Sequence, residues 1–256
     1  MKGIRTLNLL SLLAAILVSA LANILPINHV HTGEIWDSFH AMFAPEKFVF
    51  VIWIVIYLTL LVFSIYQIMP TQKNNERLNR IGIWFILANV FNGGWIFAWH
   101  FYQFGLALIL MVGLLVSLLV IYQRLKIGSG KMNPNERWLV DLPFSLYLGW
   151  TSVTLVMNSA ALLLDLNWSG FGISESGWTV AAIILLIILG VLIAIKKSEV
   201  FYPLVIIWAF IGIAVNGNGN TIVTMSAWVG AALLLIIIVI ARGSLRRKQL
   251  IDRYKR

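Results

Sequence analysis

Long blocks of apolar residues alternate with short polar connections along the whole chain. Each block has roughly the 20 residues that a helix needs to cross the hydrocarbon core of a bilayer. Backbone groups in lipid must pair within a helix or a closed barrel, and the alternating pattern of a barrel is absent, so the blocks are predicted to be helices. We therefore predict an all-α, polytopic membrane bundle of about eight transmembrane helices. The expected spans are Leu7–Leu25, Phe48–Ile68, Ile81–Trp99, Gly105–Tyr122, Trp138–Leu163, Trp178–Ile195, Val200–Val215 and Ile222–Ala241.

The composition is typical of a membrane protein and excludes several kinds of functional site. Hydrophobic residues make up 60% of the chain and charged residues only 11%, which is too little charge to cover the surface of a soluble domain. The chain has no cysteine, so disulfides, thiolate metal sites and cysteine nucleophiles are excluded. No Ser-His-Asp set, phosphate loop or pair of carboxylates is recognisable, and we do not expect an enzyme.

The basic residues predict the orientation, because loops rich in Lys and Arg are retained on the cytoplasmic side. Of the 19 Lys and Arg residues, all but Lys47 lie at the N-terminus, in alternate connections such as the one with Lys131, or in the C-terminal tail. This predicts a multipass protein of the plasma membrane with both termini in the cytoplasm. The tail SLRRKQLIDRYKR follows a span directly, so we expect it to contact anionic lipid head groups rather than nucleic acid.

The first expected span also resembles a signal peptide. Basic residues precede an apolar stretch, and Ala20-Leu21-Ala22 looks like a cleavage site. Cleavage there would leave seven spans and still satisfy the charge rule. We favour a retained span, because the apolar run continues to Leu25 and is long enough to cross a bilayer.

Polar and aromatic residues inside three spans fall on shared helix faces. At 3.6 residues per turn, each set forms one narrow stripe. Amides are costly in lipid, so Asn89, Asn92 and Asn158 are expected to face protein or a cavity. Two interpretations remain open: hydrogen bonds that staple the helices together, and an aromatic-lined ligand pocket. The stripes are Trp53 and Tyr57; Asn92, Trp95 and Trp99; and Tyr147, Trp150, Thr154 and Asn158.

Residues near the span ends have simpler interpretations. The histidines His29, His31 and His40 share the first outer loop with two carboxylates, which suggests zinc or haem ligation, but their spacing fits no metal motif and we favour a solvated loop. His100 is expected at the interface, and Asp141 is expected to pair with a neighbouring Arg. Tryptophans near span ends are assigned to membrane anchoring, and these are Trp36, Trp84, Trp138, Trp168 and Trp178.

Three motifs, in order on the right spans, resemble the TspO/MBR family of tryptophan-rich sensory and translocator proteins. The second span opens with a Pro and carries Trp-x-x-x-Tyr. The third carries Asn-x-x-Trp with an aromatic one turn on, and the fifth carries Tyr-x-x-Trp-x-Ser with a later Asn. The matching residues are Pro45, Trp53 and Tyr57; Asn92, Trp95 and Trp99; and Tyr147, Trp150, Ser152 and Asn158.

The resemblance implies a TspO-like five-helix bundle in residues 1–165, followed by three additional helices and a basic tail in residues 166–256. It also implies a pocket for a hydrophobic or tetrapyrrole ligand such as a porphyrin or haem, with no required cofactor, and it allows a homodimer. The chain departs from the family where Lys47 replaces a Trp and where Leu146 replaces a Pro. We therefore expect a sensor or carrier that binds its ligand through Trp53, Tyr57, Asn92, Trp95, Trp99, Tyr147, Trp150 and Asn158.

A small secondary transporter is the alternative. In that case Asn89, Asn92 and Asn158 line a polar path for a small molecule. Transporters commonly consist of inverted repeats around a site at the midplane of the membrane. Eight spans divide into two sets of four, but no such symmetry is detectable in the sequence, so we favour the sensor or carrier.

Overall fold

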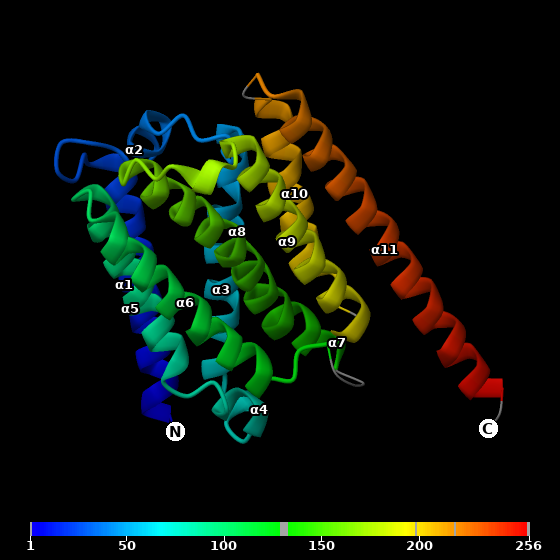
Figure 1. Cartoon of the computed structure of the whole chain (residues 1–256). Coiled ribbons are helices and arrows are strands. Elements are labelled where there is room, and N and C mark those ends of the chain that lie inside the picture. The colour runs from blue at the N-terminus through cyan, green and yellow to red at the C-terminus, as the bar shows by residue number, and fades with distance from the viewer. Residues whose placement is uncertain (1, 129–132, 198, 218, 255–256) are drawn as a thin grey trace. The chain divides into compact units, whose positions relative to one another are not determined.

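The computed structural model describes residues 2–128, 133–197, 199–217 and 219–254, with side chains described as far as residue 243. The basic residues Lys131, Lys255 and Arg256 lie outside this range. Within it, every regular element is a helix (Figure 1). The long helices are α1 (Lys2–Ile24), α3 (Ile52–Ile68), α5 (Trp84–His100), α6 (Phe104–Arg124), α8 (Leu142–Asp165), α9 (Glu175–Lys197), α10 (Phe201–Asn216) and α11 (Thr221–Tyr254). The short helices are α2 (Thr32–Ser38), α4 (Glu76–Asn79) and α7 (Pro134–Glu136).

A long helix lies at each of the eight expected positions, which confirms the polytopic helical bundle. Among the described residues, six helical segments are long and apolar enough to cross a membrane, whereas α10 is apolar but has only 16 residues. Helix α5 has 17 residues, a length of about 25 Å at 1.5 Å per residue. It begins three residues later than predicted, because Gly82 adopts a positive φ of 58° that is incompatible with a helix.

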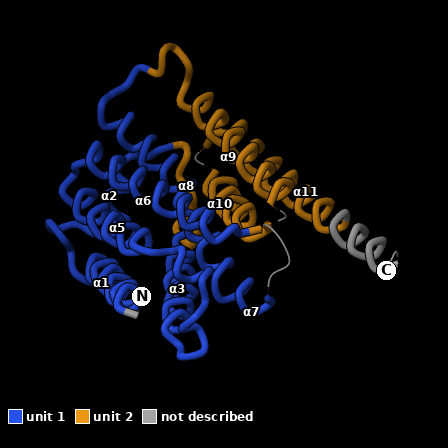
Figure 2. Tube along the Cα trace, turned by 90° about the horizontal axis from the view of Figure 1, so that it is seen from below, with its two compact units in different colours: residues 1–41, 50–127, 132–169 blue, residues 42–49, 128–131, 170–256 orange. Residues whose placement is uncertain are grey.

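The chain forms two compact units, coloured separately in Figure 2. Unit 1 comprises Met1–Ala41, Phe50–Ile127 and Met132–Ser169, and unit 2 comprises Met42–Val49, Gly128–Lys131 and Gly170–Arg256. The second unit therefore includes a short segment from the N-terminal half of the chain, Met42–Val49, which immediately precedes α3. Each unit is described by itself below.

The five long helices of unit 1 form a closed ring. Helix α1 packs against α3 and α5, α5 packs against α6, α6 packs against α8, and α8 packs against α3. Phe63, Phe85 and Phe144 from three of these helices are fully buried. Their rings make edge contacts, with centroids 4.8–5.6 Å apart, in an arrangement that favours aromatic attraction. The ring thus has an interior that is screened from lipid.

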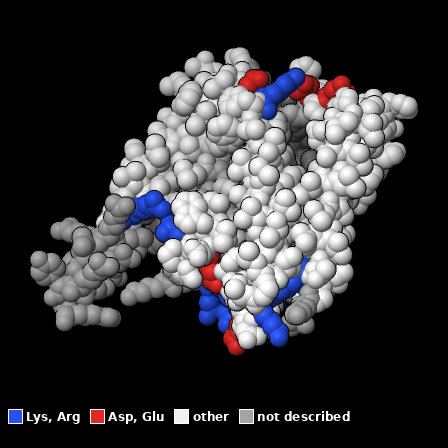
Figure 3. Space-filling model, turned by 180° about the vertical axis from the view of Figure 1, so that it is seen from behind, with Lys and Arg blue, Asp and Glu red and all other residues white. Residues whose placement is uncertain are grey.

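On the face shown in Figure 3, the charged side chains gather toward two opposite ends, and uncharged side chains cover the surface between them. Arg5 illustrates how such an end is built. Its guanidinium donates hydrogen bonds to the carbonyl oxygens of Gln67 and Gln72, at 2.9 and 2.6 Å, and to Asn79 Oδ1 at 2.7 Å. Carbonyls at a helix C-terminus have no partner within the helix, so this arginine caps the end of α3.

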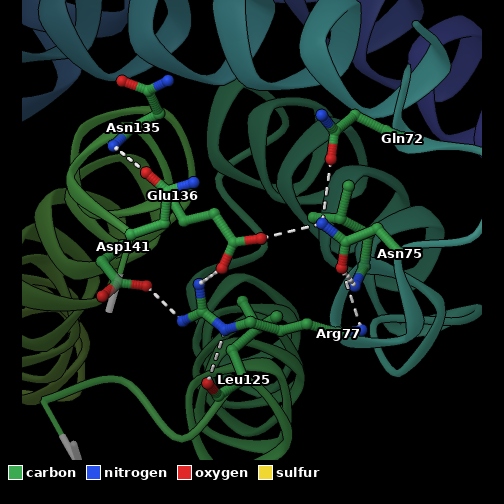
Figure 4. Close-up of polar contacts among 9 residues, drawn as sticks. Gln72, Asn75, Arg77, Leu125, Asn135, Glu136 and Asp141 are labelled. Carbon is green, nitrogen blue, oxygen red and sulfur yellow. Dashed lines mark hydrogen bonds and ion pairs between the residues drawn. The ribbon is translucent and has the colours of Figure 1, made fainter. Parts of the chain in front are cut away.

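A second arginine joins three segments at the same end of unit 1 (Figure 4). Arg77 Nη1 lies 3.0 Å from Glu136 Oε2, and Arg77 Nη2 pairs with Asp141. Its Nε donates to the Leu125 carbonyl oxygen at 3.0 Å, and Asn75 Nδ2 donates to Glu136 Oε1 at 2.8 Å. Asp141 closes a single turn of π-helix, Arg137–Asp141, that leads into α8. The expected pairing of this aspartate with an arginine is therefore confirmed.

The helices of unit 2, α9, α10 and α11, all pack against one another. Close approach depends on glycine at two points. A Cβ added at Gly190 would lie 2.8 Å from a Leu234 methyl carbon, and one added at Gly230 would lie 2.9 Å from the Phe210 ring. Small residues of this kind let membrane helices pack closely, where van der Waals contact is a main source of stability.

Candidate functional site

Four aromatic side chains from two helices meet inside the ring of unit 1. Trp53 and Tyr57, one turn apart on α3, are stacked with ring centroids 5.5 Å apart. The Trp53 ring makes edge contacts with Tyr147 and Trp150 of α8, at 6.1 and 6.3 Å. Phe50, which the sequence did not single out, makes an edge contact with Trp150 at 5.8 Å. Tyr147 and Trp150 are fully buried, whereas Trp53 and Tyr57 are partly exposed.

Helices α1 and α5 contribute polar groups to the same place. Asn92 Nδ2 donates a hydrogen bond of 2.9 Å to Tyr57 Oη. The hydroxyl oxygens of Ser19 and Tyr57 lie 2.6 Å apart, so Tyr57 connects three helices. Ser19 was missed, because its position in the apolar first span gives its helix face but does not show which neighbour it meets.

Three buried polar atoms beside these aromatics have no hydrogen-bond partner among the described residues. They are Asn92 Oδ1, Tyr147 Oη and Trp150 Nε1. Most buried polar groups in proteins are paired, so an acceptor, a hydroxyl and a donor left unpaired together require an explanation.

Trp95 and Asn158 differ from this set, because their polar groups are satisfied by the protein itself. Trp95 Nε1 donates to Asn158 Oδ1 at 2.8 Å, and Asn158 Nδ2 donates to the Thr154 carbonyl oxygen at 2.8 Å. Both side chains are buried. These are the contacts of a staple between α5 and α8.

Trp99 belongs to an aromatic cluster beneath α2. Its ring stacks on Trp95 at 5.9 Å and contacts Trp36, Phe39 and Phe104 at 6.2, 6.1 and 5.2 Å. Trp36 was expected to anchor the protein at the membrane surface. That interpretation was wrong, because this tryptophan is 8% exposed and packs inward from the amphipathic turn of α2.

His100 was also misplaced by the sequence, which put it at the interface. It is fully buried at the end of α5. Its Nδ1 lies 2.7 Å from the Ile96 carbonyl oxygen, and its Nε2 lies 3.2 Å from Thr32 Oγ1. Asn28 Nδ2 donates to the His100 carbonyl oxygen at 2.9 Å, so this residue ties the first outer loop to α5.

The described part of the first outer loop shows no cluster of three or more His, Asp or Glu residues able to hold a metal ion. Two of its residues make hydrogen bonds within the loop instead. The backbone N–H of His31 donates to Glu34 Oε2 at 2.9 Å, and His40 Nδ1 lies 3.1 Å from the Ser38 carbonyl oxygen.

The helices and this site define a class: a multipass α-helical membrane protein whose N-terminal unit encloses an aromatic and amide-lined interior. The model of the TSPO-like protein family matches residues 5–240, and the chain belongs to that family. The match continues through α9 and α10 and into α11, so it covers the last three helices as well as the five-helix ring. Comparisons with curated proteins and with solved structures gave no match.

Proposed function

We propose that this protein binds a hydrophobic ligand, with tetrapyrroles as the leading class, inside the five-helix ring of unit 1 and acts as a sensor or carrier. The observation that carries the proposal is the set of unpaired atoms on Asn92, Tyr147 and Trp150 beside the stacked Trp53 and Tyr57 rings. A ligand with a flat apolar body and a few polar groups satisfies both features, because aromatic faces stack on it and the unpaired atoms bond to it.

The eight predicted residues then have different tasks. Five of them would contact the ligand: Trp53, Tyr57, Asn92, Tyr147 and Trp150. Trp95 and Asn158 hold α5 against α8, and Trp99 connects this wall to the aromatic cluster beneath α2. We further propose that the protein lies in the plasma membrane with both termini in the cytoplasm, and that its role is binding rather than catalysis.

Titration of the full-length protein in detergent with protoporphyrin IX tests this function. Binding should quench tryptophan fluorescence saturably. Trp150→Ala removes a fully buried ring, and the loss of about 1–3 kcal/mol of aromatic contact corresponds to roughly fivefold to 150-fold weaker binding. Trp138→Ala is the matched control, because Trp138 is 59% exposed and lies outside the ring interior. Absence of saturable quenching by protoporphyrin, haem and a sterol alike would refute the proposal.

A further inference from the structure

The segment Met42–Val49, which leads into α3, obtains its hydrogen bonds from unit 2. The Ala44 carbonyl oxygen accepts from Asn216 Nδ2 at 2.8 Å, and the Glu46 backbone N–H donates to the Gly212 carbonyl oxygen at 3.1 Å. The Val49 carbonyl oxygen accepts from Trp208 Nε1 at 2.9 Å. The backbone of the segment is therefore bonded at three points to a single helix, α10.

Glu175 holds the beginning of the same segment. Its Oε1 accepts a hydrogen bond of 2.7 Å from the Met42 backbone N–H. Pro45, in the middle of the segment, has no N–H to offer, and Phe43, Pro45 and Val49 are buried. An irregular segment cannot satisfy its own backbone groups as a helix does, so these bonds fix its conformation.

The three bonding residues of α10 lie four positions apart, at 208, 212 and 216, and therefore on one face of the helix. Gly212 is the centre of this face. A Cβ added there would collide with the Val49 side chain and lie 3.0 Å from Pro45 Cβ. Trp208 also makes an edge contact with Phe48, with ring centroids 5.3 Å apart. The segment thus lies against a surface that only glycine allows it to approach.

We propose that this face of α10 is a positioning element for the ligand site, through which the last three helices set the affinity of the five-helix ring. The link is the chain itself. Val49 precedes Trp53 by one helical turn, and α3 begins at Ile52, directly after the 3₁₀ turn Lys47–Val51. The segment is thus continuous, through a single 3₁₀ turn, with the first turn of α3, which carries Trp53.

This inference rests on the proposed function for its ligand, and it adds a regulatory input to that site. Trp208, Gly212 and Asn216 touch no ligand; they act by holding the backbone that precedes Trp53. The proposed input is a change in the bonds between α10 and Met42–Val49 within unit 2, passed along the chain to the first turn of α3. We expect the loss of these bonds to change the affinity for the ligand by about fivefold or more, which is typical of coupling between two sites.

Gly212→Ala in the full-length protein is the decisive variant. The added methyl group displaces the segment, while alanine has a higher helix propensity than glycine, so α10 itself is not weakened. We expect faster hydrogen exchange in residues 42–49 and about fivefold or more weaker binding of protoporphyrin IX. Gly243→Ala is the matched control, because a Cβ at Gly243 meets nothing within 4 Å. It should change neither measurement.

Two milder variants address the case in which Gly212→Ala does not fold. Trp208→Phe retains an aromatic ring near Phe48 but removes the donor to Val49, and Asn216→Ala removes the donor to Ala44. Each loses one neutral hydrogen bond, so each should speed exchange in residues 42–49 and weaken binding by roughly twofold to tenfold.

The outcomes separate this inference from the proposed function. Unchanged exchange in residues 42–49 of Gly212→Ala overturns it, and so does faster exchange there with unchanged affinity. If the unmodified protein binds no tetrapyrrole, the proposed function fails for that ligand class. The inference is then judged by hydrogen exchange in residues 50–57. Faster exchange there in Gly212→Ala supports positioning of α3, and unchanged exchange refutes it.

Discussion

The Trp95–Asn158 hydrogen bond predicts that these two residues stabilise the bundle rather than recognise the ligand. Trp95→Phe removes the indole N–H of Trp95 and leaves the buried Asn158 Oδ1 without that donor. An unpaired buried acceptor costs about 1–3 kcal/mol in soluble proteins. Interhelical hydrogen bonds in membranes average about 0.6 kcal/mol and reach about 1.7, because the unfolded helices find other partners in the bilayer. For a pair this well buried we expect about 1 kcal/mol.

A double-mutant cycle measures this value directly. The unmodified protein, Trp95→Phe, Asn158→Leu and the double variant are unfolded with a denaturing detergent. The loss of stability in the double variant, minus the sum of the losses in the two single variants, gives the coupling between the two side chains. Asn158→Leu replaces the polar amide by an apolar side chain of similar size, so the double variant has no unpaired Oδ1 at position 158 and should recover part of the lost stability. The affinity of each folded variant for protoporphyrin IX should stay within about threefold of the unmodified protein, since each lost polar contact lies outside the ligand.

Either of two results would refute this reasoning. A coupling near zero would mean that the hydrogen bond contributes nothing to the bundle. A large loss of affinity with unchanged stability would mean that Trp95 and Asn158 contact the ligand themselves, and the site would then extend further along α5 than we propose. Thr59 gives a suitable control, because its hydroxyl bonds only to α3 backbone carbonyls, and Thr59→Val should leave both measurements nearly unchanged.

Two further predictions concern the ends of the helices. Reporter fusions after Lys73 and Arg256 should read cytoplasmic and one after Ser174 external, because all but one of the 19 basic residues fall on one predicted side; an external reading at Arg256 would contradict the eight-span topology. Arg77→Gln should lower the unfolding midpoint far more than Lys73→Gln, since it leaves two carboxylates without their arginine whereas Lys73 is exposed; equal midpoints in thermal unfolding would show that the cluster in Figure 4 is not stabilising.

The sequence predicted the helices well because apolar block length is a strong signal in a membrane. Helical periodicity also placed Trp53 with Tyr57 and Tyr147 with Trp150 on shared faces, and these pairs do meet. Periodicity shows which residues share a helix face, but it does not show which other helix packs against that face. Ser19 was missed for that reason.

Other features escaped because they depend on segments without periodicity. Trp36 and His100 lie near span ends, where interfacial residues are expected. Trp36 instead packs inward from α2 against Trp99, and His100 is buried where it meets Thr32 of α2. The contacts of Met42–Val49 with α10 join residues more than 150 positions apart, and no local pattern in either segment indicates the other. Gly212 is an isolated glycine in an apolar run. Such a glycine predicts that another segment packs closely against the helix, but it does not indicate which segment.

The order of helices around the ring has a consequence for biosynthesis. Helix α3 obtains one of its two long-helix neighbours, α8, only after α5 and α6 have been made. Until residue 165 has entered the membrane, the wall between α3 and α6 is missing, and Trp53 cannot make its contacts with Tyr147 and Trp150 of α8. At about 5–20 residues per second, the stretch from the end of α3 to the end of α8 takes several seconds to synthesise. During that interval the nascent bundle must be shielded by the insertion machinery or by bound lipid, so a substitution that slows docking of α8 should reduce the yield of inserted protein before it alters the stability of the finished fold.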